Sequence, residues 1–222
     1  MHSFRSVLLI RHSEAEKTLR QVHGGSGTPL TSRGRDDTRD LASTLRQWNS
    51  LSSDTAIFAG PRPQARETAS ILGRELLLAV HDQPSFRNIG MGIFDGLTDD
   101  AARSRDPAAM ARLEAWRLGR ATVEDIKIPE AETLMDFLHR VDDGLRYIAA
   151  VSWNPIIVTT RSLGIAIINI LTGYLDGKRT GYLRYRFDAG SITLLENSPS
   201  GWNISIHNDT GYLAGDRDFK DD

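Results

Sequence analysis

Short apolar runs alternate with longer amphipathic stretches along most of the chain. The first run covers residues 7–10, and similar runs lie within 54–60 and 154–160. A short continuous apolar run is typical of a strand that is buried on both faces of a parallel sheet. Between the runs, apolar residues such as Leu41 and Leu45 recur at helical spacing. This alternation predicts an α/β fold with a mostly parallel sheet and helices on both faces.

Weaker patterns predict the remaining elements. We expect a helix over 101–119 that breaks near Pro107, a long amphipathic helix from Glu132 through Ile148, and an apolar helix over 165–171. Further strands are expected at 75–80, 182–187, 191–196 and 202–207. No linker interrupts the chain, so residues 1–222 are expected to form one domain with a flexible polar tail at 215–222.

Composition narrows the classes of function. The formal net charge is -2 without a long run of one sign, which argues against broad nucleic-acid binding. The chain has no cysteine, which excludes disulfides and thiolate-metal sites. The apolar run at 7–10 is too short for a signal peptide or a membrane span, so a cytoplasmic location without a membrane partner is the default expectation.

Candidate chemistry stands directly after the first apolar run, where Arg11, His12, Ser13 and Glu14 follow one another. Parallel strands carry their ligands at their carboxyl ends. An arginine grips an anionic oxygen through two parallel hydrogen bonds, and a histidine acts as a nucleophile or proton carrier near neutral pH. The alternative is structural: Arg11 pairs with a carboxylate such as Glu14, and His12 is a satisfied residue at a strand end. The motif alone leaves both open.

A second cationic segment begins the helix expected after residues 54–60. Arg62 and Arg66 are four residues apart and share a face if the helix already includes Arg62. A helix start favours an anion. A surface ion pair of Arg66 with a nearby acid is the equally weighted alternative. For the glycine-rich stretch at 24–29, a surface loop is favoured over a ligand loop.

Taken in order, these stretches resemble the histidine phosphatase superfamily, in its phosphoglycerate-mutase-like branch. Residues 11–14 are similar to the family's Arg-His-Gly-Glu signature, and residues 29–34 to its Pro-Leu-Thr-x-x-Gly segment. Residues 59–69 resemble Ser-Ser-Pro-x-x-Arg-Ala-x-Gln-Thr-Ala, residues 87–96 resemble Arg-Glu-x-x-x-Gly-x-x-x-Gly, and Glu132-Thr133 resembles the start of the Gly-Glu-Ser helix. The resemblance implies a three-layer α/β sandwich with a mostly parallel central sheet.

The resemblance also implies a mechanism. Family members transfer a phosphoryl group to the signature histidine, here His12, while two arginines, one of them Arg11, and a second histidine surround the phosphate. A glutamate protonates the leaving group, and neither a metal nor another cofactor is needed. This is positioning plus electrostatics, as in phosphoryl transfer generally.

The chain departs from the family pattern at the phosphate site. Gln64 stands where the second arginine is expected, Asn88 where the acidic proton donor is expected, and Thr160 where the second histidine is expected. Arg161 replaces a family glycine one residue further on. Residues that would compensate are Glu14 or Asp95 as the acid, and Arg62 or Arg161 as the phosphate clamp.

Three functions follow from these observations. The favoured one is a divergent phosphatase that hydrolyses a phosphate monoester through His12, with Arg11 and Glu14 as further catalytic residues. Its altered phosphate pocket would contain Arg62, Gln64, Asn88, Thr160 and Arg161. The second is reuse of the fold for acid–base chemistry on a small metabolite with Arg11 and His12. The third is a non-catalytic protein that binds an anion or a partner. The expected partner is a small-molecule substrate, phosphorylated or anionic, and the formation of a homodimer is left open.

Overall fold

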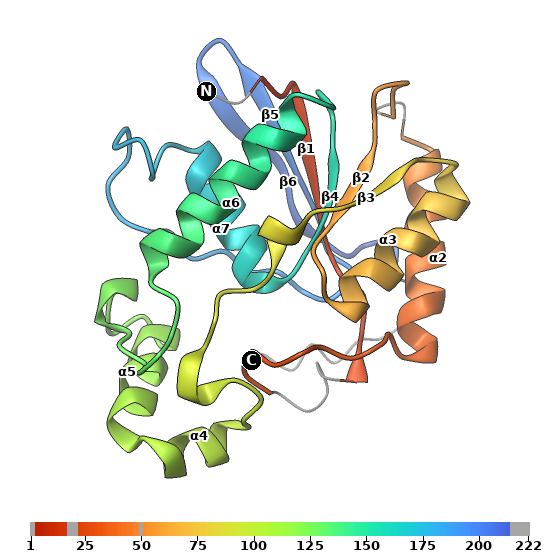
Figure 1. The fold of residues 1–222 in the computed structure, drawn as a ribbon. Helices are drawn as coiled ribbons and strands as arrows, with labels where there is room; N and C mark the ends of the chain where they lie inside the picture. Colours follow the sequence, from red (N-terminus) through yellow and green to blue (C-terminus); the bar gives the residue numbers. More distant parts are fainter. Residues whose placement is uncertain (1–2, 17–21, 49–50, 214–222) are drawn as a thin grey trace.

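The computed structural model describes residues 3–16, 22–48 and 51–213. These residues contain a six-stranded sheet with spatial strand order β3-β2-β4-β1-β5-β6 (Figure 1). The strands are β1 (Ser6–Arg11), β2 (Ile57–Ala59), β3 (Val80–Asp82), β4 (Ile156–Thr159), β5 (Ile192–Ser198) and β6 (Gly201–Asp209). The first four are mutually parallel, whereas β5 runs antiparallel to both of its neighbours. The predicted mostly parallel α/β sheet is therefore confirmed.

Helices cover both faces of this sheet (Figure 1). The pair on one face is α2 (Ser32–Arg46) and α3 (Pro63–Leu76), and the pair on the other is α6 (Leu134–Ala149) and α7 (Arg161–Leu171). Strand β1 shows why its sequence is continuously apolar. Leu8 and Ile10 pack into the core with α2 and α3, whereas Val7 and Leu9 pack into the core with α6 and α7. Successive side chains along β1 therefore alternate between these two cores.

A smaller core lies under α4 (Asp99–Arg105) and α5 (Pro107–Arg117). Phe94 and Met110, both fully buried, lie at its centre. Asp106 ends α4 and caps α5 by accepting a hydrogen bond from the Ala109 N–H at 2.9 Å. The predicted break near Pro107 is confirmed, because a proline is well placed in the first turn of a new helix.

Two of the predicted strands are wrong. The strand expected at 75–80 is the end of α3, which stops at Leu77 in the left-handed conformation (φ 58°), and β3 begins only at Val80. The segment 182–187 is extended but joins no sheet. Instead, the Asn169 side chain donates to the Leu183 carbonyl and accepts from the Leu183 N–H, both at 2.9 Å. The buried Asn169 amide thus supplies the backbone hydrogen bonds of Leu183 that a neighbouring strand would otherwise supply.

The remaining predicted elements are confirmed to within a few residues, including the antiparallel strands β5 and β6. The tail expected at 215–222 lies outside the described residues. Within the described ranges, every helix is too short or too polar to cross a membrane.

The first turn of α2 generates a stability prediction. A Cβ atom at Gly34 would lie 2.1 Å from the carbonyl oxygen of Glu14 and 3.0 Å from its carbonyl carbon. Both are backbone atoms that cannot rotate away. We expect Gly34→Ala to lower the free energy of unfolding by about 1–3 kcal/mol, the usual cost of overpacking, in a denaturant titration. Gly90→Ala is the control, since its nearest contact would be an ordinary 3.4 Å. An equal loss in the control would contradict the prediction.

Candidate active site

Three neighbouring parallel strands end at the same edge of the sheet. Arg11 of β1 is in register with Thr159 of β4, and Val158 of β4 is in register with Ala59 of β2. The His12 N–H continues the ladder by donating to the Thr159 carbonyl at 2.9 Å. His12 and Thr160 therefore leave adjacent strands side by side, which is the arrangement expected for a ligand site in an α/β sheet.

The His12 side chain is held in one tautomer. It is buried, with 5% of its surface exposed, and its Nδ1 lies 2.8 Å from the carbonyl oxygen of Ser13. A carbonyl oxygen only accepts hydrogen bonds, so Nδ1 carries the proton. In the neutral imidazole the lone pair then resides on Nε2. This is the electronic state that a nucleophilic histidine requires.

The Arg11 guanidinium is fixed by the segment that precedes β5. Its Nη1 donates to the carbonyl of Phe187 at 2.5 Å, and the Gly190 N–H donates to the Arg11 carbonyl at 3.1 Å. The Glu14 carboxylate accepts a 2.7 Å hydrogen bond from the hydroxyl of Thr31, the residue that caps α2. Glu14 thereby ties the signature segment to the start of that helix.

The helices that follow β2 and β4 both begin without a side-chain cap. Helix α3 starts after Arg62, and α7 starts after Thr160. Thr160 is 6% exposed, and no described residue gives its Oγ1 a hydrogen-bond partner. By contrast, α2, α4, α5 and α6 start with capping side chains, namely Thr31, Thr98, Asp106 and Thr133. Uncapped N–H groups and the positive end of a helix dipole favour an anion.

Two amides stand near this edge where charged groups were expected. Gln64, in the first turn of α3, is 3% exposed, and its Oε1 accepts from the Thr28 N–H at 3.3 Å. The Asn88 Oδ1 is buried without a hydrogen-bond partner among the described residues. An amide can donate or accept a hydrogen bond, but it adds no charge to neutralise a phosphate.

The predicted arginines have different surroundings. Arg62 is half-buried and donates from Nη1 to the Gly24 carbonyl at 3.1 Å. Burial lowers the pKa of the Arg62 guanidinium, and the charge of Asp95 acts in the opposite direction. Arg161 is exposed as the first residue of α7. Arg66 forms two hydrogen bonds to Asp82, at 3.0 and 2.9 Å, so the surface ion-pair interpretation of Arg66 is confirmed.

A group that the sequence analysis missed joins the loop after the signature to α4 and α5. His23 is buried, and its Nε2 lies 2.7 Å from Asp99 Oδ1. Arg117 of α5 binds the other oxygen of Asp99 at 2.8 Å. The residues that make these contacts are separated by up to more than ninety positions in the sequence, so no local sequence pattern predicts the contacts.

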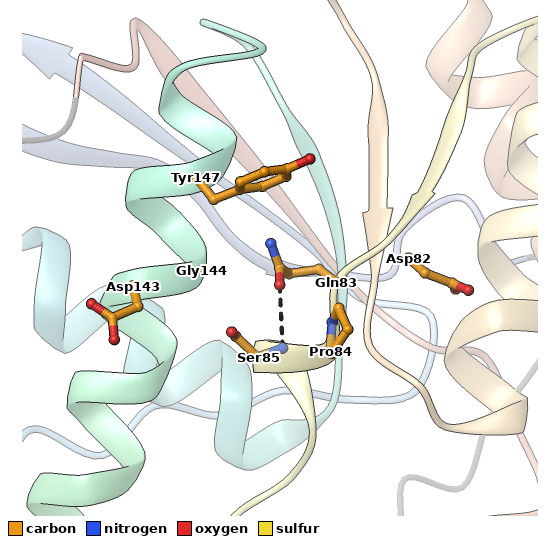
Figure 2. A pocket seen from close by; sticks show the side chains of 7 residues that line it. All are labelled: Asp82, Gln83, Pro84, Ser85, Asp143, Gly144 and Tyr147. Atoms are coloured by element: carbon orange, nitrogen blue, oxygen red, sulfur yellow. Dashed lines mark hydrogen bonds between the residues drawn. The ribbon is translucent and has the colours of Figure 1, made fainter.

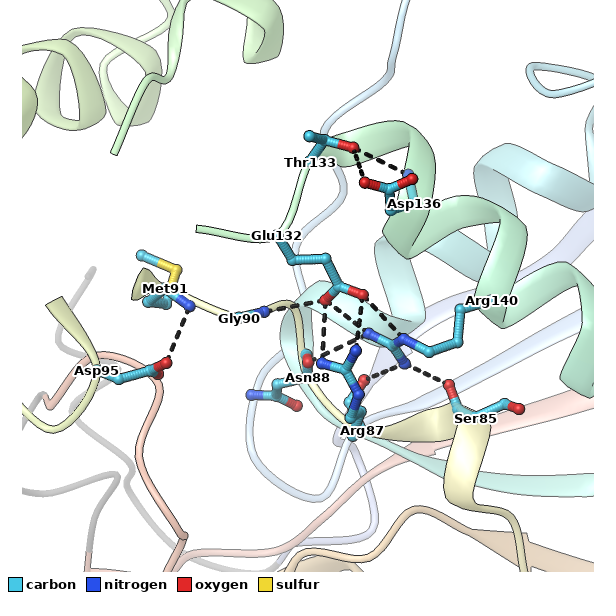
Figure 3. A network of polar contacts seen from close by, with 10 residues as sticks. All are labelled: Ser85, Arg87, Asn88, Gly90, Met91, Asp95, Glu132, Thr133, Asp136 and Arg140. Carbon is cyan, nitrogen blue, oxygen red and sulfur yellow. Dashed lines mark hydrogen bonds and ion pairs between the residues drawn. The ribbon is translucent and has the colours of Figure 1, made fainter. Parts of the chain in front are cut away.

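A second missed group holds the segment that carries Asn88 (Figure 3). Glu132 accepts hydrogen bonds from Arg140 at 2.7 and 2.9 Å, from Arg87 at 3.0 Å and from the Gly90 N–H at 3.0 Å. Arg140 also donates from Nη1 to the carbonyls of Ser85, at 2.5 Å, and of Arg87, at 3.1 Å. The network therefore grips the backbone on both sides of Asn88. The resemblance of Glu132 to a family helix start was the only signal for it.

The same contacts set the protonation of Glu132. Burial raises the pKa of its carboxyl. The hydrogen bonds from Arg140 and Gly90 and the charges of Arg140 and Arg87 together lower the pKa by more than burial raises it. The net pKa is below the ordinary value, so Glu132 is ionised at neutral pH.

A cavity of about 320 Å³ lies between the end of β3 and α6 (Figure 2). Its lining residues are Asp82, Gln83, Pro84, Ser85, Asp143, Gly144 and Tyr147. None of them is a predicted site residue. Among the described residues, no group of three or more His, Asp or Glu side chains is arranged to hold a metal ion.

Comparison with known proteins identifies the family of this chain. The model of the histidine phosphatase superfamily (branch 1) matches residues 7–210. The chain belongs to the histidine phosphatase superfamily. A curated relative, the probable phosphoglycerate mutase GpmB of Enterobacter sp. (strain 638), is 26% identical over 221 residues, covering 93% of this chain and 94% of that protein. The predicted family and its phosphoglycerate-mutase-like branch are therefore confirmed.

Solved structures of similar fold agree with this assignment to the histidine phosphatases. Bacillus stearothermophilus YhfR has a TM-score of 0.75 at 21% identity, covering 93% of this chain and 98% of that one. The mycobacterial glucosyl-3-phosphoglycerate phosphatase Rv2419c has a TM-score of 0.72 at 20% identity, covering 93% of this chain and 99% of that one. At these identities the likeness establishes the fold.

The Glu132 network generates a prediction on stability and its pH dependence. Glu132→Gln leaves Arg140 and Arg87 without their carboxylate, and we expect a loss of about 1.5–3 kcal/mol, typical of hydrogen bonds to a charged group. Because the folded pKa of Glu132 lies below its ordinary 4.5, its contribution is present above about pH 4.5 and is lost as the pH falls through the folded value. The difference between wild type and variant should therefore shrink in acid.

Denaturant titrations at several pH values measure this difference. Glu130→Gln is the matched control, because Glu130 is exposed two residues away. A difference between wild type and Glu132→Gln that stays constant from neutral to acidic pH would contradict the assignment.

Proposed function

We propose that this histidine phosphatase family member hydrolyses small phosphorylated molecules through a phosphorylated His12. The observation that carries the proposal is the His12 tautomer, with Nδ1 bound to the Ser13 carbonyl and the lone pair on Nε2. The name of a structural neighbour, glucosyl-3-phosphoglycerate phosphatase, supports phosphate removal as the reaction class.

The reaction would proceed in two displacements. The Nε2 lone pair attacks phosphorus, the bond from phosphorus to the leaving oxygen breaks, and the leaving group departs with that electron pair. Water then attacks the phosphohistidine, the P–N bond breaks, and its electrons return to Nε2. The protons of the attacking water stay with inorganic phosphate and solvent. Such transfer depends on positioning and on charge stabilisation around the phosphoryl oxygens.

The phosphate would be held by one side-chain cation and by backbone. Arg11 supplies the cation, and the uncapped starts of α3 and α7 supply N–H groups. The Thr160 hydroxyl and the Gln64 and Asn88 amides would complete the hydrogen bonds. Arg62 and Arg161 are the further candidates to bind substrate, and a catalytic role for Glu14 stays a prediction.

One alternative function has a specific observation in its favour. Gln64, Asn88 and Thr160 are neutral where the family pattern has charged or titrating groups. This would suit acid–base chemistry by His12 on a non-phosphorylated anion held by Arg11. The two functions differ in whether phosphate is released.

The test is a comparison of His12→Ala with wild type on a generic aryl phosphate. We expect His12→Ala to lower kcat/KM by at least about 10³-fold, as expected when the nucleophile is removed. The readout is released phosphate between acidic and neutral pH. His139→Ala is the matched control, because His139 is exposed on α6.

Either of two results would contradict the proposal. One is a folded wild-type protein that releases no phosphate. The other is a release that persists unchanged in His12→Ala.

A further inference from the structure

Several carboxylates on the segments that follow the signature are engaged as acceptors. Three of them pair with arginine: Asp82 with Arg66, Asp99 with Arg117, and Glu132 with both Arg87 and Arg140. In each case the arginine occupies at least one oxygen of the carboxylate.

Two further carboxylates stand closer to the signature. Asp95 accepts from the Gly25 N–H at 3.0 Å and from the Met91 N–H at 3.3 Å, the second of which is drawn in Figure 3. Glu14 accepts from the Thr31 hydroxyl at 2.7 Å. Both carboxylates therefore already accept hydrogen bonds from within the chain.

Asn88 is also held in place, but its side chain is an amide and not an acid. Arg140 and Glu132 clamp its segment, and its Oδ1 is buried without a partner among the described residues. An amide can hydrogen-bond to a leaving oxygen, but it cannot transfer a proton to it. The segment that the Glu132–Arg140 network holds therefore presents an amide and not an acid.

Two arginines could stabilise the negative charge of a leaving group. Arg62 lies half-buried before α3, and Arg161 is exposed at the first position of α7. Both therefore flank the strand ends from which His12 and Thr160 emerge. A fixed cation stabilises a leaving group that departs as an anion, but it does not protonate an alkoxide.

We propose that the site cleaves phosphoanhydrides and acyl phosphates, and that it discriminates against alkyl phosphate esters. The inference rests on the proposed function of His12. When the anhydride P–O bond breaks, the electron pair leaves on a carboxylate or a phosphate, and no proton is required. Those anions are stable at neutral pH, since their conjugate acids have pKa values of about 4 and about 6.

Alkyl esters differ in the basicity of the group that leaves. An alkoxide is the anion of an acid about as weak as water, so it has to be protonated as it departs. General acid catalysis contributes about 10²–10⁴-fold in enzymes that have it. A site in which none of the described residues serves as the general acid would penalise alkyl esters and leave acyl phosphates nearly unaffected.

The experiment is a leaving-group series on the wild-type protein. Substrates are acetyl phosphate, pyrophosphate, several aryl phosphates of graded phenol acidity and glycerol phosphate, each measured beside His12→Ala to subtract spontaneous hydrolysis. We expect log(kcat/KM) to fall steeply as the pKa of the leaving group rises, with glycerol phosphate at least about 10²-fold below acetyl phosphate. A flat series, or His12-dependent hydrolysis of glycerol phosphate at a similar rate, would overturn the inference.

The same series separates the two proposals. If acetyl phosphate and the aryl phosphates show no His12-dependent release, the proposed function itself fails. If all substrates are cleaved alike, only the inference about the leaving group fails.

A variant adds a second arm. Asn88→Glu supplies a carboxyl group at the clamped segment, and we expect it to raise the ratio of kcat/KM for glycerol phosphate to kcat/KM for acetyl phosphate by at least about tenfold, as a partial gain of general acid catalysis. Asn88→Gln is the control and should give no such gain. If Asn88→Glu does not fold, the wild-type series decides alone.

Discussion

The hydrogen bond between His12 Nδ1 and the Ser13 carbonyl is the constraint on which the proposed chemistry depends. It fixes the tautomer and so leaves the lone pair on Nε2. The backbone of the same residue extends the ladder to Thr159, which places the imidazole at the junction of β1 and β4. The sheet, with a core on each face, makes this junction rigid. The preorganisation of this imidazole is thus a consequence of strand register.

Around this imidazole the chain uses backbone and fixed cations in place of titrating side chains. The starts of α3 and α7 lack side-chain caps, and Thr160 keeps a buried hydroxyl beside the second of them. Helix starts hold anions through N–H groups and the helix dipole, and neither changes with pH in the physiological range. The Glu132–Arg140 network adds order by clamping the backbone around Asn88. The result is a well-ordered arrangement with few side chains that titrate near neutral pH.

The sequence predicts most of the fold because the strong signals are local. A buried parallel strand needs every side chain to be apolar, and residues 7–10 satisfy this requirement. The strand predicted at 182–187 is wrong because the backbone of Leu183 is satisfied by one distant side chain, Asn169. An extended segment and a paired strand have the same local pattern, so no local signal separates them.

The candidate site likewise contains residues that the sequence predicted and contacts that it did not predict. His12, Gln64 and Thr160 were expected together because of the resemblance to the family, and strand register places the ends of β1, β2 and β4 at one edge. The partners of Glu132 and of His23 were not expected, because Arg140 and Asp99 come from remote helices whose placement depends on tertiary packing. Arg66 proved to be a surface ion pair with Asp82, a choice that spacing alone left open.

Direct detection of a phosphorylated His12 tests the central claim. The protein would be mixed with acetyl phosphate, quenched with denaturant at alkaline pH to preserve a P–N bond, and analysed by mass spectrometry with peptide mapping. The account predicts one phosphoryl group per chain on the peptide that contains His12, attached at Nε2 by nuclear magnetic resonance, and none in His12→Ala. Phosphate release without this adduct, or an adduct on another residue, would contradict the account.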